Sequence, residues 1–147
     1  MQALQLANIS VFITALSGGP DSSALACLAD RYARSYGASH QAIIVNHNIR
    51  SDATDEAERV RQRMQARAIA TQIVTVQDKA PSTGIQEWAR HQRFALLTKQ
   101  ARQQRAVLLL AHHQADQAET VLMRLARGSG IAGLAAMRGL THRDAVP

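Results

Sequence analysis

The chain has 147 residues, one domain of ordinary size that can bury a core without staples. Its one cysteine, Cys27, excludes an intramolecular disulfide and a cysteine-rich metal site, and it fits a reducing, cytoplasmic location. No apolar stretch approaches the roughly 18 residues of a membrane span. The net charge of +6 arises in residues 79–147, where ten side chains are basic and four acidic. This half favours phosphate-bearing partners such as nucleic acids, although a solvated surface would show the same excess.

Four short apolar runs alternate with helix-like segments along the chain. They cover residues 9–16, 41–45, 72–76 and 106–111 and are rich in Val, Ile and Leu, which is typical of buried parallel strands. Residues 107–110 show no polar alternation, so we expect both faces of that strand to be covered. Alternating strands and helices predict an α/β fold, a Rossmann-like open parallel sheet with helices on both faces.

The intervening helices carry end signals. Gly37 predicts the end of the first helix, and the acidic residues in 51–56 predict the start of the second. Thr83 and Gln86 match a capping box at the start of the third. The apolar spacing in residues 118–125 predicts a fourth helix. The apolar face of the third helix is predicted to consist of Ile85, Trp88, Ala89 and Leu96.

The sharpest feature is the turn between the first strand and the first helix, which reads Ser17, Gly18, Gly19, Pro20, Asp21 and Ser22. Backbone N–H groups at a helix start, serine hydroxyls and glycines without a Cβ atom suit a phosphate chain. The Asp21 carboxylate would repel phosphate unless Mg²⁺ lay between them, so Asp21 is a predicted metal ligand. The turn has neither the P-loop nor the dinucleotide pattern, and a plain strand-to-helix turn is the alternative.

The six residues 17–22 resemble the PP-loop of the N-type ATP pyrophosphatases. That family includes GMP, NAD and asparagine synthetases, tRNA thiolases and lysidine synthetases. The resemblance implies a nucleotide alpha-hydrolase-like parallel sheet of five strands, with order 3-2-1-4 here and the fifth strand missing or incomplete. It also implies that residues 17–22 bind ATP, which is cleaved between its α- and β-phosphates.

A second polar segment follows the fourth strand and contains His112, His113 and Asp116. In an open parallel sheet, ligands bind beyond the carboxyl ends of strands where the strand order reverses. Asp21 and Asp116 would then face each other and share one Mg²⁺. The alternative is structural: the histidines end a strand, and Asp116 compensates a helix dipole.

Residues 112–137 resemble the lysidine synthetase signature. Family members read His-His-x-Asp-Asp-Gln-x-Glu-Thr, then Arg-Gly-Ser-Gly and Gly-Leu-x-x-Met. The chain matches these runs except at Ala115, which stands where the family has the first aspartate. The resemblance therefore gives the metal and catalytic role to Asp116, a catalytic role to His113, and nucleotide contacts to His112, Arg127 and Gly128.

Residues 46–51 resemble the family run Asp-His-Gly-Leu-Arg, with Asn46 and Asn48 in place of Asp and Gly. Asparagine adopts the left-handed backbone that glycine would supply, though less freely. The resemblance implies that the adenine of ATP meets Ile44, Asn46 and His47, chiefly through the backbone of residues 44–46.

Arg90 and Arg93 in the third helix resemble the family's Ala-Arg-x-x-Arg-Tyr stretch. At positions i and i+3 they project to one side, and paired guanidinium groups suit phosphate or carboxylate. The resemblance gives them a catalytic role in holding phosphate. The alternative is an ordinary solvated helix face.

The resemblance, over about residues 9–137, implies a cytoplasmic ligase that uses ATP and Mg²⁺. In that reaction the O2 atom of a cytidine in the CAU anticodon of an isoleucine tRNA attacks the α-phosphate of ATP, and pyrophosphate leaves. The ε-amine of free L-lysine then attacks C2 of the base, and AMP leaves. Family enzymes continue past this point, so residues 1–147 are expected to be a truncated ATP-binding domain without the C-terminal tRNA-recognition domains.

Three other functions stay open. A tRNA thiolase needs a reactive thiol, and the one candidate, Cys27, is expected to be buried and inert in a helix. The chain could bind ATP without catalysis, or bind tRNA without using ATP. Production of AMP that depends on tRNA would distinguish the enzyme from both binding modules.

Overall fold

The computed structural model describes residues 9–111. In chain order the elements are β1 (Val11–Ala15), α1 (Pro20–Ser35), β2 (Ser39–Asn46), α2 (Ala53–Gln65), β3 (Thr71–Thr75), α3 (Ile85–Gln104) and β4 (Val107–Leu109). All four predicted strands are present, with ends that differ from the prediction by one or two residues. Among these residues no helix is long and apolar enough to cross a membrane.

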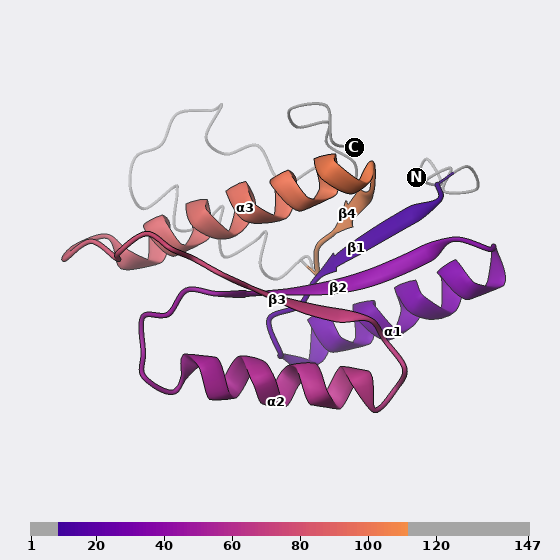
Figure 1. The fold of residues 1–147 in the computed structure, drawn as a ribbon, viewed down its shortest axis with the longest axis horizontal. Coiled ribbons are helices and arrows are strands. Elements are labelled where there is room, and N and C mark those ends of the chain that lie inside the picture. The colour runs from indigo at the N-terminus through magenta and orange to yellow at the C-terminus, as the bar shows by residue number, and fades with distance from the viewer. Residues whose placement is uncertain (1–8, 112–147) are drawn as a thin grey trace, which may run out of the picture.

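The strands form one parallel sheet in the order β3-β2-β1-β4, as predicted. Helices α1 and α2 lie against one face of the sheet, and α3 lies against the other (Figure 1). The strand order reverses between β1 and β4, so the carboxyl ends of β1, β2 and β4 lie side by side at one edge. The predicted fourth helix and any fifth strand fall in residues 112–147, outside those described.

Side chains that alternate along the strands build a core on each face of the sheet. Phe12 packs with Ala33 of α1, whereas its neighbour Ile13 packs with Leu97 of α3. Residues 107–110 divide in the same way, with Val107 and Leu109 on the α1 side and Leu108 and Leu110 on the α3 side. Both faces of that run are therefore covered, as its unbroken apolar sequence predicted.

The predicted end of the first helix is confirmed. Gly37 has a left-handed φ of +66°, and the N–H of Ala38 donates to the carbonyl of Ala33 at 2.9 Å. This is the glycine-terminated Schellman arrangement. The acidic start of the second helix is also confirmed, because Asp55 and Glu56 lie in the first turn of α2.

Two predictions for the third helix are wrong. Its N-cap is Gly84, with a left-handed φ of +68°, so Thr83 lies one residue too early to cap the first turn. The buried face is also different, because Leu97 and Ala101 are fully buried and Ile85 is 38% exposed. The helix meets the sheet along the 93–97–101 stripe, with spacing i, i+4, i+8, and its N-terminal turn extends beyond the sheet.

Candidate functional site

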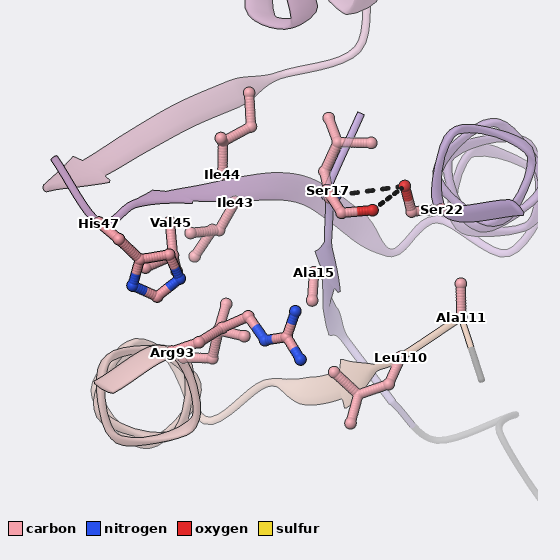
Figure 2. Close-up of a pocket in the computed structure, with 12 residues that line it drawn as sticks. Ala15, Ser17, Ser22, Ile43, Ile44, Val45, His47, Arg93, Leu110 and Ala111 are labelled. Atoms are coloured by element: carbon pink, nitrogen blue, oxygen red, sulfur yellow. Dashed lines mark hydrogen bonds between the residues drawn. The ribbon is translucent and has the colours of Figure 1, made fainter. Parts of the chain in front are cut away.

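A cavity of about 240 Å³ lies at the carboxyl ends of the central strands (Figure 2). Its walls come from four segments: β1 with the loop after it, β2 with the residue after it, α3, and the end of β4. This is the position where ligands bind in open parallel sheets. The lining residues are Ala15, Leu16, Ser17, Ser22, Ile43, Ile44, Val45, His47, Arg93, Leu97, Leu110 and Ala111.

The loop after β1 is closed by the hydroxyl of Ser22. This buried side chain accepts the backbone N–H of Ser17 at 3.2 Å, and its oxygen lies 3.0 Å from Oγ of Ser17. The same hydroxyl donates to the carbonyl of Gly19 at 3.1 Å, and so does Oγ of Ser23 at 2.8 Å. Residues 17–22 therefore form a compact turn, with both predicted serines on the cavity wall.

The two glycines of the loop differ in backbone conformation and in the space around them. Gly18 has a φ of +88°, and a Cβ atom there would lie 2.7 Å from Cγ2 of Val60 in α2. Gly19 has an ordinary φ of −71°, and a Cβ atom there would meet only Oγ of Ser17, at 3.7 Å. The described fold therefore requires glycine at position 18 and would accept alanine at 19. A bare backbone at Gly19 is useful for the close approach of a ligand.

Helix α1 begins at this loop, with Pro20 in its first turn. Within residues 9–111, no side chain makes a cap hydrogen bond at this N-terminus. The first N–H groups of a helix lack intrahelical acceptors and carry the positive end of its dipole. Asp21 is exposed in the first turn. The loop and the start of α1 thus form a surface suited to an anion.

Arg93 supplies a positive charge from the opposite wall, and Figure 2 shows its guanidinium group directed into the cavity. The side chain is half-buried, and burial, followed by the charge of Arg90, lowers the pKa of Arg93. The group stays protonated at neutral pH. None of the described residues that line the cavity is acidic. A half-buried guanidinium on a wall whose described residues include no carboxylate favours an anionic ligand.

Arg90 does not line the cavity. It is exposed, and its guanidinium carbon lies 5.6 Å from the ring centre of Phe94, while that of Arg93 lies 5.8 Å from the same centre. The two arginines therefore lie on neighbouring parts of the helix surface, as their spacing predicted, but only Arg93 reaches the cavity.

His47 follows β2 and lines the cavity beside Arg93 (Figure 2). Burial, and then the positive charge of Arg93, lower the pKa of His47, so the ring is neutral at pH 7. Its Nδ1 atom is buried without a hydrogen-bond partner among the described residues. The ring centre lies 6.3 Å from that of Trp88 in α3.

The turn that carries His47 confirms the predicted backbone of Asn48, whose φ is +52°. Asn46 is buried at the end of β2 and does not line the cavity, whereas Ile44 does. Cys27 is half-buried on α1, in part against the core, and lines a separate groove with Gly18 and Met64. The expectation of a buried cysteine is therefore only partly met, because Cys27 packs against the core on one side and lines this groove on the other.

The cavity brings together Ser17 and Ser22 of the loop with Ile44, His47 and Arg93. Gly18 and Pro20 of the same loop line the separate groove instead. Sequence reasoning missed Leu97, although its spacing of four from Arg93 was a signal for a shared helix face. The remaining predicted site residues lie outside the described residues: His112, His113, Asp116, Arg127 and Gly128.

Comparisons with known proteins agree with this geometry. A family model described as a PP-loop domain matches residues 2–146. A tRNA(Ile)-lysidine synthase of Bradyrhizobium diazoefficiens is 41% identical over 145 residues, which are 97% of this chain and 40% of that protein. One of Rhodopseudomonas palustris is 44% identical over 137 residues, 91% of this chain and 40% of that protein. The chain thus spans about two fifths of the length of these relatives.

Among solved structures, the U34-tRNA thiolase NcsA from Methanococcus maripaludis, determined with its 4Fe-4S cluster, is similar with a TM-score of 0.74. The match has 24% sequence identity and covers 87% of this chain and 46% of the thiolase chain. At that identity the likeness establishes a common fold.

Proposed function

Because this chain belongs to the PP-loop domain family, whose members use ATP, we propose that it is the ATP-binding part of a tRNA(Ile)-lysidine synthase. In this proposal the enzyme joins L-lysine to the wobble cytidine of an isoleucine tRNA with the CAU anticodon, in the cytoplasm, and releases AMP and pyrophosphate. The observation that carries it is the cavity between the PP-loop and Arg93 at the switch point of the sheet. The 41–44% identity to lysidine synthases supports the choice of reaction.

We expect the phosphate chain of ATP to lie along residues 17–22 and the start of α1. The adenine and ribose would enter the cavity beside Ile44 and His47 and meet the backbone of residues 44–46. The volume of about 240 Å³ is slightly below the roughly 300–1,000 Å³ of typical small-molecule sites. Such a cavity suits the base and sugar, with the α-phosphate within reach of Arg93 and the β- and γ-phosphates outside the cavity on the loop.

Mg²⁺ would be held by Asp21 together with Asp116. Asp21 is an exposed carboxylate in the first turn of α1, beside the proposed phosphate position. This fits Mg²⁺, which takes one or two carboxylates and completes its coordination with phosphate oxygens and water. When bound, the ion would neutralise phosphate charge.

In-line attack on the α-phosphorus needs positioning and charge neutralisation more than covalent help from the protein. Cytidine O2 would attack, the bond to the pyrophosphate oxygen would break, and the lysine ε-amine would then displace AMP. Arg93, with its charge inside the cavity, would stabilise the added negative charge on the α-phosphate. His113 would donate to the same phosphate, His112, Arg127 and Gly128 would contact the nucleotide, and exposed Arg90 would hold a tRNA phosphate.

The test is transfer of labelled lysine by this chain to an isoleucine tRNA with the CAU anticodon, in the presence of Mg²⁺ and ATP. Asp21→Asn and Asp116→Asn should each reduce transfer on the order of 100-fold or more, because a metal ion at a reacting phosphate contributes several kcal/mol. Asp55→Asn is the matched control, since Asp55 is also an exposed carboxylate in the first turn of a helix. It should leave transfer unchanged.

Absence of transfer while ATP still binds would contradict catalysis by this chain and favour a nucleotide-binding module. Absence of ATP binding would contradict the proposal as a whole. A loss in Asp55→Asn equal to that in Asp21→Asn would show that general helix destabilisation, and not metal binding, explains the effect.

A further inference from the structure

The turn between β2 and α2 carries His47 into the cavity, and it is held by one buried side chain. We propose that Asn46 is a positioning residue of the site: its side-chain amide fixes this turn to α2 and thereby sets the place of the His47 ring. The expected consequence, tighter binding of ATP, rests on the proposed function.

Both polar atoms of the Asn46 side chain, and its backbone carbonyl, make hydrogen bonds. Its Oδ1 accepts the backbone N–H of Asn48 at 2.9 Å, and its Nδ2 donates to Oγ1 of Thr54 at 3.1 Å. Its backbone carbonyl accepts the N–H of Val76 at 2.8 Å. The residue is only 5% exposed, so water does not readily replace these partners.

The first of these bonds supports an uncommon backbone. Asn48 has a φ of +52°, a conformation that costs a residue with a side chain free energy relative to glycine. A side-chain oxygen that accepts the N–H two residues later is the Asx turn, which stabilises such reversals. His47 lies between Asn46 and Asn48, so the backbone on both sides of it is held, and this fixes the point from which its side chain enters the cavity.

The second bond connects the turn to the phosphate loop by way of α2. Thr54 lies in the first turn of α2, and Val60, six residues or about 9 Å further along the helix, fills the space beside Gly18. Leu16, which precedes the loop, packs in the same core cluster as Val60. The helix therefore contacts both the base side and the phosphate side of the proposed ATP site, and Asn46 is its link to the base side.

The test compares Asn46→Ala with Asn46→Asp and Thr54→Val in the whole chain. NMR follows the titration of the His47 ring, and calorimetry with Mg²⁺ and ATP gives the dissociation constant. In Asn46→Ala the pKa of His47 should rise toward its ordinary value, because the ring leaves the burial and the Arg93 charge that lower it. ATP should bind roughly five- to tenfold more weakly, the effect of one or two hydrogen bonds.

In Asn46→Asp the pKa of His47 and the affinity for ATP should both stay close to the wild-type values. The carboxylate still accepts the N–H of Asn48, and the Thr54 hydroxyl can rotate to donate to it. Thr54→Val removes only the bond to α2 and should give a smaller shift of the same sign. Ser39→Ala is the matched control, since Ser39 makes a side-chain hydrogen bond to the carbonyl of Ser10 at the opposite end of β2. It should change neither measurement.

A His47 titration in Asn46→Ala that matches the wild type would overturn the positioning role, whatever happens to ATP affinity. If Asn46→Ala does not fold, an unchanged His47 titration in Thr54→Val would overturn it instead. Failure of the wild-type chain to bind ATP would contradict the proposed function, while the titration would still decide whether Asn46 places His47.

Discussion

At the scale of single residues, Gly18 and Gly37 show how two left-handed glycines can differ. Their φ angles are +88° and +66°. A Cβ atom at Gly37 would meet nothing within 4 Å, whereas at Gly18 it would press on Val60 of α2. At position 37 glycine is therefore needed only for the left-handed backbone conformation. At position 18 it is needed both for that conformation and for the close packing against Val60.

Gly37→Ala should lower the free energy of unfolding by about 1 kcal/mol, the cost of a left-handed residue with a side chain. Gly18→Ala should lower it by about 2–4 kcal/mol, because overpacking against Val60 adds to that cost. Urea unfolding of the two variants beside the wild type measures both values. Equal losses would show that Val60 moves aside without cost, contrary to this account.

At the scale of elements, one face of α3 both packs against the sheet and supplies a residue to the cavity. Leu97 and Ala101 are fully buried against the sheet, and Arg93, one turn before Leu97, directs its charge into the cavity. The packing of the helix thus decides which arginine reaches the site. Arg90 lies one turn nearer the N-terminus of α3, does not line the cavity and stays exposed.

Leu97→Ala should cost about 2–5 kcal/mol of stability, the range for a fully buried leucine, and should also weaken ATP binding because Leu97 lines the cavity. Leu28→Ala is the control, because Leu28 is a helix leucine that is 64% exposed, and it should change stability by about 0.5 kcal/mol or less. Thermal unfolding and calorimetric titration measure the two effects. A Leu97→Ala variant as stable as Leu28→Ala would mean that α3 does not depend on this contact.

At the scale of the whole described molecule, one polar chain joins the sheet to a helix and a distant turn. Oγ1 of Thr14 in β1 lies 2.9 Å from Nε2 of buried His40 in β2, and Nδ1 of His40 lies 3.5 Å from Asp30 in α1. Asp30 pairs with Arg34 at 2.7 Å, and Arg34 donates to the carbonyl of Ala68 at 2.8 Å. Among the described residues Nδ1 of His40 has no hydrogen-bond partner, so its approach to Asp30 is an electrostatic contact. The other three contacts are hydrogen bonds.

Burial lowers the pKa of His40 below its ordinary 6.5, although Asp30 partly opposes this. The unfolded chain therefore binds the proton at higher pH than the folded chain does. The contribution of neutral His40 to the free energy of unfolding should be complete above pH 6.5. It should be lost as the pH falls from there through the lowered pKa of the folded chain. Unfolding free energies measured between pH 8 and 5 should show this loss in the wild type and a smaller one in His40→Gln. Identical pH profiles would exclude His40 as the source.

Local sequence patterns were sufficient for most of the fold. The apolar runs identified all four strands, and Gly37 identified a helix end, because strand burial and glycine conformation act within a few residues. The loop at 17–22 was also recognisable, since the hydrogen bonds that close it join residues that are neighbours in the chain. The left-handed backbone of Asn48 was also predictable, because it depends on the residue type at that position.

Other features depended on segments that meet only after folding. The buried face of α3 was mispredicted, because contact with the sheet, here at Leu97 and Ala101, decides which helix positions are covered. The N-cap was mispredicted by one residue, because the helix begins after the left-handed Gly84. The different positions of Arg93 and Arg90, the bond from Asn46 to Thr54, and the approach of Val60 to Gly18 likewise depend on how the helices pack. The sequence by itself thus determined the strands, the turn at Gly37 and the loop at residues 17–22, because each depends on interactions between residues that are near one another in the chain. Only the tertiary structure decided which side chains share a cavity, because that depends on distances between elements that the chain order does not set.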